Sequence, residues 1–120
     1  MSSTESKPRP RGDIRFGATK KAKTGCGNLY ITINQDDEGR PFELFTQMGK
    51  AGGCSASQCE AIGRVVSLAL RSGLDPQEIA GQLTGISCHL PAGMDEKKVL
   101  SCSDAIGQAL EWFLEDGRRK

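Results

Sequence analysis

The sequence predicts an α+β fold, in which a small antiparallel sheet of two to three strands is followed by three helices packed on one face. Two observations lead to this prediction. Segments in which apolar and polar residues alternate lie before residue 50, and segments with apolar residues at helical spacing lie after it. Strands followed by helices are typical of α+β domains. With 120 residues, the chain has the length of a single domain.

The strands are expected in the first part of the chain. Leucine or isoleucine occupies every second position from residue 29 to residue 33, so residues 28–34 are predicted to form a strand with one buried face. The turn-forming stretch QDDEGRP follows, and a second strand is expected over 42–48. The segment 14–25 is a candidate third strand at the edge of the sheet.

The first helix is expected to begin at Ser55. The Ser55 side chain can cap the helix, and Gln58, three residues later, can reach back to complete a capping box. Gly73 is expected to end the helix. Between these points apolar residues recur at helical spacing and form a stripe that we expect to be buried: Cys59, Ile62, Val66 and Leu70.

Two further helices are expected after it. Asp75 is a capping residue and Pro76 is a proline suited to a first helical turn, so the second helix is expected to start here and to end near Gly85. A loop then leads to the third helix, which is expected over 103–115 with an apolar inward face.

Charge is unevenly distributed along the chain. Residues 1–24 contain seven Lys or Arg against two acids, whereas residues 25–120 contain nine against thirteen. We therefore expect a disordered basic arm over 1–21, a folded domain over 22–116 and a short basic tail over 117–120.

The sequence also suggests a compartment. No stretch approaches the roughly 20 apolar residues of a membrane span, and residues 1–12 lack the apolar run of a signal peptide. We therefore expect a cytoplasmic protein, in which thiols stay reduced. Five cysteines in such a protein indicate metal binding, redox chemistry or simple burial.

The five cysteines fall into two groups. Cys59 lies on the apolar stripe of the first helix and is expected to be a buried hydrophobic residue. The other four, Cys26, Cys54, Cys88 and Cys102, each lie at the edge of an expected element. Four thiolates can bind Zn²⁺ tetrahedrally or hold an iron–sulfur cluster. Their spacing contains no C-x-x-C and matches no known zinc knuckle, so scattered buried thiols remain the alternative.

Other functional patterns are weaker. Lys20, Lys21, Lys23 and Lys50 are candidate ligands for phosphates or nucleic acid, and a solvated basic segment is the alternative. The stretch GKAGGCS lacks the residue order of a phosphate-binding P-loop. No carboxylate pair or histidine-centred triad can be assembled, so no catalytic residue is predicted.

Several motifs resemble those of a known family. The stretches KTGCGNLYITIN, GKAGGCS, LTGISC and LSCSDAI are similar to the TSCPD domain, and the resemblance covers residues 22–114. This domain occurs near the C-terminus of adenosylcobalamin-dependent (class II) ribonucleotide reductases and as small free-standing proteins. The chain departs from the naming motif at Leu100, in place of Thr, and at Ser103, in place of Pro.

The resemblance implies a function. The family pattern has a cysteine at the positions of Cys26, Cys54, Cys88 and Cys102, which favours a metal site of four cysteines, with zinc preferred over an iron–sulfur cluster. The reductase barrel is absent, so we expect no catalysis by this chain alone. The first hypothesis is an accessory or interaction module that is stabilised by a bound metal ion and is connected with DNA synthesis. Its partner would be a nucleotide, nucleic acid or a ribonucleotide reductase. The alternative is a small thiol-based redox enzyme or transferase that uses Cys54 or Cys102.

Overall fold

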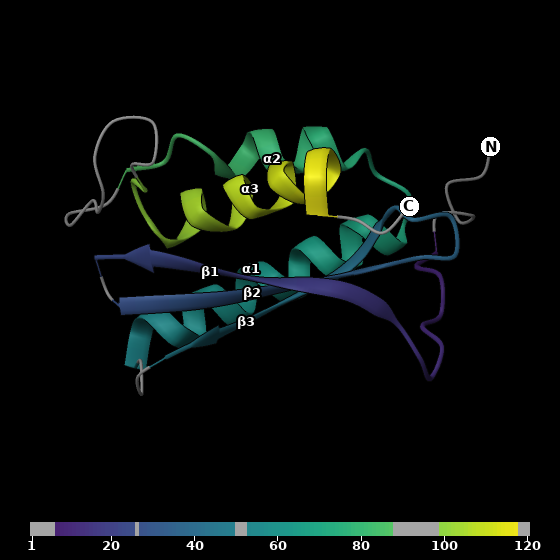
Figure 1. Ribbon diagram of the computed structural model, residues 1–120, viewed down its shortest axis with the longest axis horizontal. Coiled ribbons are helices and arrows are strands. Elements are labelled where there is room, and N and C mark those ends of the chain that lie inside the picture. Colours follow the sequence, from purple (N-terminus) through teal and green to yellow (C-terminus); the bar gives the residue numbers. More distant parts are fainter. Residues whose placement is uncertain (1–6, 26, 50–52, 88–98, 118–120) are drawn as a thin grey trace.

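The computed structural model of the protein describes residues 7–25, 27–49, 53–87 and 99–117, without the side chain of Cys54 (Figure 1). Three strands precede three helices, so the expected α+β class is confirmed. The elements are β1 Phe16–Thr24, β2 Gly27–Gln35, β3 Pro41–Met48, α1 Gly53–Arg71, α2 Pro76–Leu83, α3 Cys102–Trp112 and a π-helical turn Phe113–Gly117. No helix in these ranges is long and apolar enough to cross a membrane.

The strands form one antiparallel sheet in the order β1-β2-β3. Because directly opposite residues on neighbouring strands share a face, the pairing divides the side chains into two sets. One set contains Leu29, Ile31 and Ile33 of β2, which are fully buried. Leu44 of β3 lies opposite Ile33 and belongs to the same set. This face of the sheet therefore carries the hydrophobic core.

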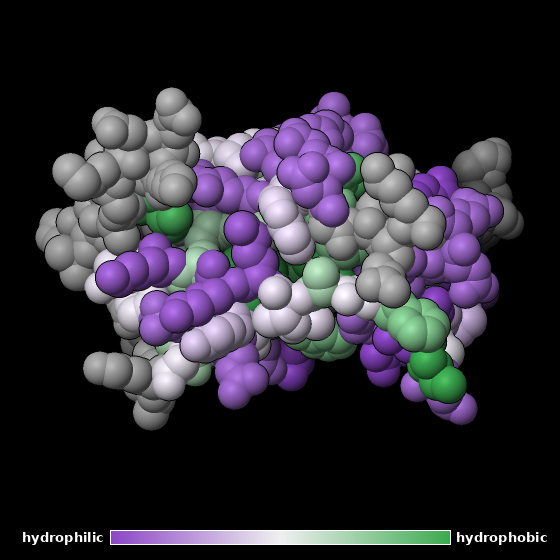
Figure 2. All heavy atoms as spheres, in the orientation of Figure 1, coloured by the Kyte–Doolittle hydropathy of each residue, from purple (hydrophilic) through white to green (hydrophobic). Residues whose placement is uncertain are grey.

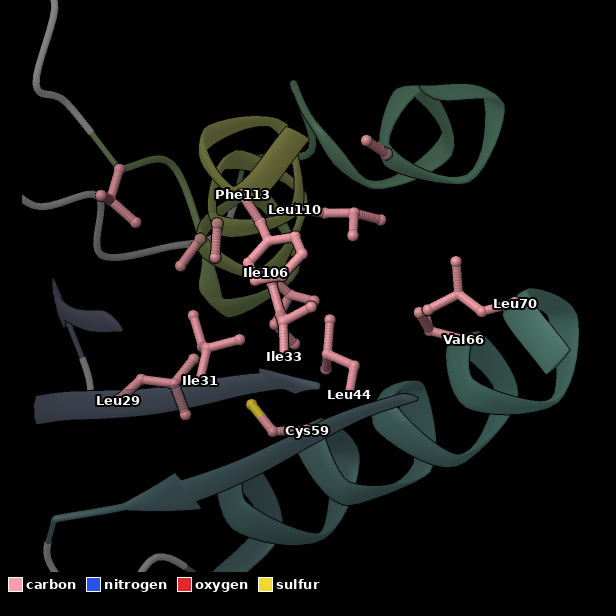
Figure 3. Packing of buried hydrophobic residues seen from close by; sticks show 14 residues of the cluster. Leu29, Ile31, Ile33, Leu44, Cys59, Val66, Leu70, Ile106, Leu110 and Phe113 are labelled. Carbon is pink, nitrogen blue, oxygen red and sulfur yellow. The ribbon is translucent and has the colours of Figure 1, made fainter. Parts of the chain in front are cut away.

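Helix α3 covers the buried face of the sheet (Figure 3). Ile106, Leu110 and Phe113 belong to the same buried cluster as Ile31 and Ile33, and all five are 0% exposed. Burying each such side chain contributes about 2 kcal/mol. Thus α3 and the sheet hold each other in place mainly through this contact.

Helix α2 packs closely on α3. A β-carbon at Gly107 of α3 would lie 2.7 Å from Thr84 Cγ2 and 3.0 Å from Leu83 Cβ. Only glycine allows the end of α2 to approach α3 at this distance. The close contact fixes the point at which the chain leaves α2.

Helix α1 runs along the outer edge of β3. The Leu44 N–H donates to Ser67 Oγ at 2.9 Å, and Ser67 Oγ donates to the Leu44 carbonyl at 3.0 Å. A single serine thus pairs backbone groups that an edge strand would otherwise expose. Cys59 points from α1 into the core and is 1% exposed, which confirms its prediction as a buried hydrophobic residue.

The boundaries agree with the sequence in part. Gly73, with a φ of 93°, follows α1, and Asp75 caps α2 by accepting a hydrogen bond from Gln77 N, as predicted. The prediction that Ser55 caps the first helix is wrong, because α1 already begins at Gly53. Strand β1 includes residues 16–21, which lie within both the expected arm and the candidate edge strand.

The segment 7–15, which we call the strap, crosses the end of the molecule opposite the β1–β2 turn (Figure 1). The Arg9 side chain donates to the carbonyls of Arg71 and Leu70 at the C-terminus of α1, at 3.2 and 3.3 Å. It also pairs with Asp36 at 3.2 Å. A cation is favoured at these carbonyls, because the C-terminus of a helix carries partial negative charge. The strap thereby ties α1 to the turn between β2 and β3.

A second arginine of the strap binds a buried acid. Arg11 makes two hydrogen bonds to the Glu43 carboxylate, at 2.6 and 2.8 Å, and Asn34 donates a third at 2.8 Å. The Glu43 side chain is only 2% exposed. Burial alone would raise the pKa of Glu43, but the hydrogen bonds from Arg11 and Asn34 outweigh it and lower the pKa below its ordinary value. Glu43 therefore remains a carboxylate that holds the strap.

Phe42 provides the surface on which the strap lies. Its ring is buried, and the guanidinium carbons of Arg15 and Arg9 lie 4.3 and 4.7 Å from the ring centroid. These distances are typical of cation–π contacts. Three arginines of the strap, Arg9, Arg11 and Arg15, are thus engaged by the domain itself.

Candidate functional site

The end of the sheet opposite the strap, which we call the cysteine end, begins with the turn between β1 and β2. Thr24 Oγ1 donates to the Gly27 carbonyl across this turn at 2.8 Å. Thr24 is buried, and Gly27 has a φ of 128°, a conformation that favours glycine. Cys26 lies between Gly25 and Gly27, outside the described residues.

Strand β3 ends beside the same turn. Met48 pairs with Leu29, and the Gly49 N–H donates to the Asn28 carbonyl at 2.8 Å. Asn28 directly follows Gly27. Helix α1 then begins at Gly53, so the backbone of Cys54 is the second residue of α1. The Cys54 side chain lies outside the described part of the chain.

Helix α3 begins at this end as well. Ser101 is its N-cap: Ser101 Oγ accepts from the Asp104 N–H at 3.0 Å and donates to the Ile86 carbonyl at 2.5 Å. Cys102, the first residue of α3, is half-buried, and its Sγ donates to Thr24 Oγ1 at 3.8 Å. The start of α3 therefore contacts both the β1–β2 turn and the segment after α2.

Asp104 holds the two sides of this arrangement together. Its carboxylate accepts hydrogen bonds from Gly85 N and Leu100 N, both at 2.9 Å, and from Gln108 Nε2 at 2.7 Å. Asp104 is only 3% exposed. It therefore fixes the residues from which the chain leaves α2 and enters α3. Sequence reasoning did not include Asp104 among the site residues, although it belongs to the S-C-x-D motif.

The predicted metal ligands are only partly described. Of the four, only the Cys102 side chain lies within the described ranges; those of Cys26, Cys54 and Cys88 do not. Among the side chains that are described, no three metal-ligating residues come together. The four-cysteine site therefore stays a prediction. The contacts of the residues next to the cysteines are the structural evidence relevant to it.

The predicted anion-binding lysines do not share one face. Lys21 and Lys23 are exposed, and their β2 partners are Tyr30 and Asn28 on the face turned away from α3. Lys20 points to the other side, where its Nζ lies 5.0 Å from the centroid of the Trp112 ring. Lys50 lies outside the described residues. Figure 2 shows hydrophilic side chains gathered over β1.

Two hollows lie near these residues. A pocket of about 320 Å³ next to the cysteine end is lined by Lys23, Thr24, Gly27, Asn28, Tyr30 and Gly49. A groove of about 630 Å³ runs between β3 and α1, with Phe45 and Leu68 among its walls. The arginines of the groove include Arg64, which pairs with Glu60 at 2.7 Å, and Arg11 of the strap.

The comparisons with known proteins identify one family. The TSCPD domain matches residues 4–114, which is nearly the whole chain. No curated protein and no solved structure matches the chain. The matched range includes all four cysteines of the predicted metal site and the whole strap.

Proposed function

Because the chain belongs to the TSCPD domain family, which is related to the C-terminal domain of ribonucleotide reductase, we propose that it is an accessory interaction module stabilised by one metal ion. The ligands are Cys26, Cys54, Cys88 and Cys102, and the preferred metal is Zn²⁺. The module binds a partner that carries phosphates, a nucleotide or nucleic acid. We expect no catalysis by this chain alone.

One observation carries the metal proposal: the described neighbours of all four cysteines meet at the cysteine end. Cys102 Sγ contacts Thr24, two residues before Cys26. Ser101 binds the Ile86 carbonyl, two residues before Cys88. Gly49 binds Asn28, which links the approach to α1 and Cys54 with the same turn. Segments separated by up to 78 residues in the chain thus contact one another at this end of the sheet.

The chemistry of the donors favours zinc. Four thiolates satisfy tetrahedral Zn²⁺, and a closed site of this kind is structural. Such an ion would link the β1–β2 turn to α1, α3 and the segment after α2. A domain of this size gains much from a metal, because its core is small. An iron–sulfur cluster is the alternative, since it uses the same ligands.

The charge distribution supports a partner that carries phosphates. The three arginines of the strap bind Glu43, Asp36, Phe42 or the end of α1. Within the described ranges, Lys21 and Lys23 form no ion pair, and both are exposed. We therefore assign phosphate binding to Lys21 and Lys23 of β1 and not to the strap.

Metal content of the purified protein tests the proposal. We expect about one zinc per chain in the wild type, because four thiolates hold one ion. The variant Cys102→Ser should lose most of this metal, whereas Cys59→Ala, which removes a buried thiol outside the site, should keep it. Equal metal content in the two variants, or a wild type without metal, would contradict a four-cysteine site.

Thiol reactivity separates the proposal from the enzymatic alternative. Thiolates bound to a metal should alkylate slowly until a chelator is added. A thiol enzyme that uses Cys54 or Cys102 predicts one rapidly alkylated cysteine in the native protein without chelation. Mass spectrometry of peptides from the alkylated protein identifies which cysteines reacted, so the two functions give different results in one experiment.

A further inference from the structure

The face of the sheet turned away from α3, which we call the open face, carries polar and aromatic residues in ordered rows. Lys21 of β1 lies opposite Tyr30 of β2, and Tyr30 lies opposite Gln47 of β3. Because strand partners share a face, these three side chains project from the same side of the sheet. The rows on either side consist of Lys23 with Asn28, and of Thr19 with Thr32 and Phe45.

The residues of the open face are accessible to solvent. Lys21, Lys23 and Gln47 are exposed, and Tyr30 is half-buried. Phe45, a large apolar side chain, is 48% exposed. On the other face of the same strands, Leu29, Ile31 and Ile33 are completely buried. The open face is therefore a second surface of the sheet, on which no described helix packs in the way that α3 packs on the core face.

The two aromatic residues stand on neighbouring strands. Tyr30 is opposite Gln47, so Phe45, two residues before Gln47, is a diagonal neighbour of Tyr30. Side chains in this relation lie roughly 7 Å apart. The Arg11 guanidinium lies 5.8 Å from the Phe45 ring centroid, which places a cation beside the second ring. Two aromatic rings with adjacent cations form a suitable surface for stacking bases.

The charges of the open face complement a phosphate backbone. Lys21 and Lys23 are two residues apart on β1, so both project from the open side. Glu43 is the only acidic residue of the three strands, and it lies at the far end of this face, where Arg11 and Asn34 bind its carboxylate. The row that contains Tyr30 and the two rows beside it also carry polar side chains that can form hydrogen bonds with the edges of bases. These are Asn28, Thr19, Thr32 and Gln47.

We propose that the open face binds single-stranded nucleic acid, with bases stacked on Tyr30 and Phe45 and with phosphates bound by Lys21 and Lys23. This inference rests on the nucleic-acid part of the proposed function and is independent of the metal. A sheet surface can stack only bases that are free of a duplex, so the ligand is a single strand. Stacking accepts any base, and we therefore expect little sequence preference.

Fluorescence anisotropy with labelled oligo-dT and oligo-rU, measured on the full chain at several salt concentrations, tests the inference. The variant Lys21→Ala should weaken binding and reduce the slope of log K against log salt by about 0.7. Lys20→Ala is its matched control, because Lys20 neighbours Lys21 on β1 but points toward Trp112. The control should leave the slope unchanged.

Stacking is tested separately from charge. Tyr30→Ala should weaken binding about tenfold, whereas Tyr30→Phe should retain most of the affinity, because the aromatic face remains. Circular dichroism and thermal unfolding of each variant show whether the fold is kept. If Tyr30→Ala does not fold, Phe45→Ala measures the same contribution at a more exposed position.

The possible outcomes separate this inference from the proposed function. Equal effects of Lys20→Ala and Lys21→Ala, with no effect of Tyr30→Ala, would place nucleic-acid binding elsewhere on the chain and overturn the inference alone. Tighter binding of a duplex than of either single strand would also overturn it. No binding of any nucleic acid by the metal-loaded wild type would overturn both the inference and the nucleic-acid part of the proposed function. The metal part would remain to be judged from metal content.

Discussion

The two ends of the sheet are held by different means. At one end, arginines of the strap bind two buried carboxylates and the C-terminus of α1, and the contacts are ion pairs and hydrogen bonds between described side chains. At the cysteine end, backbone groups and small polar side chains bring segments together, and we propose that a metal ion holds them there. The strap end is thus stabilised by charge pairing, whereas our proposal assigns coordination to the cysteine end.

This difference predicts which conditions and substitutions destabilise each end of the sheet. The ion pairs of the strap join half-exposed arginines to buried carboxylates, and such pairs contribute modestly and weaken with acid or salt. A structural metal site contributes far more and depends on thiolates. Loss of the metal should therefore destabilise the protein more than loss of the strap. The predictions below are ordered by the expected size of the effect.

Removing the metal should have the largest effect. A strong chelator added to the reduced wild-type protein should lower the free energy of unfolding by at least about 5 kcal/mol, because metal binding is coupled to folding. Thermal unfolding followed by circular dichroism, with and without chelator, measures this. The same chelator added to Cys102→Ser should have little further effect. An unchanged melting temperature in the wild type would contradict a structural metal.

Replacing Asp104 should have the next largest effect. Asp104→Asn removes one carboxylate oxygen and leaves a buried N–H unpaired, at a cost of about 2 kcal/mol. Because Asp104 fixes Gly85 and Leu100, the variant should also release metal at a lower chelator concentration than the wild type does. Asp37→Asn, at an exposed position, is the control. A lower free energy of unfolding with unchanged metal release would show that Asp104 stabilises the fold but does not affect metal binding at the cysteine end.

Breaking the strap should have a smaller, pH-dependent effect. Glu43→Gln should cost about 1 kcal/mol at neutral pH, because it replaces charge-assisted hydrogen bonds from Arg11 by weaker neutral ones. The pKa of Glu43 is lowered in the folded state from its ordinary value of 4.5, so its stabilising effect is complete above that value and is lost as the pH falls through the folded pKa.

Chemical denaturation at several pH values measures this dependence. The stability difference between the wild type and Glu43→Gln should narrow as the pH falls below about 4, since the wild-type carboxyl becomes neutral. Metal loss in acid affects both proteins and cancels in the comparison. A difference that stays constant down to low pH would show that the Glu43 charge does not stabilise the strap.

The lysines of the open face should have the smallest effect on stability. Replacing Lys21 and Lys23 together by alanine should change the free energy of unfolding by less than about 0.5 kcal/mol, because both are exposed. Metal content should also stay the same. Denaturant titration and metal analysis of the double variant test this, and a large loss of stability would indicate that these lysines hold the fold and not a ligand.

Much of the fold could be predicted from local sequence patterns. The alternation from Leu29 to Ile33 predicted β2, and the helical stripe predicted the buried position of Cys59, because periodicity reports directly which face is buried. The start of α1 was misplaced because several small residues precede Ser55, and nothing in their local pattern marks a single cap.

The candidate site was harder to predict, because its contacts join distant segments. Arg9 binds carbonyls more than 60 residues away, so the strap, which has the sequence of a solvated basic segment, is in fact bound to the domain. Asp104 binds Gly85, 19 residues away, and neither residue type marks that contact in the sequence. The opposite orientations of Lys20 and Lys21 follow only once the strand register is known.

X-ray absorption at the metal edge of the purified wild-type protein tests the central claim most directly. The account predicts zinc with a first shell of four sulfur atoms at about 2.3 Å. A first shell dominated by nitrogen or oxygen, or zinc well below one ion per chain together with no iron, would contradict it.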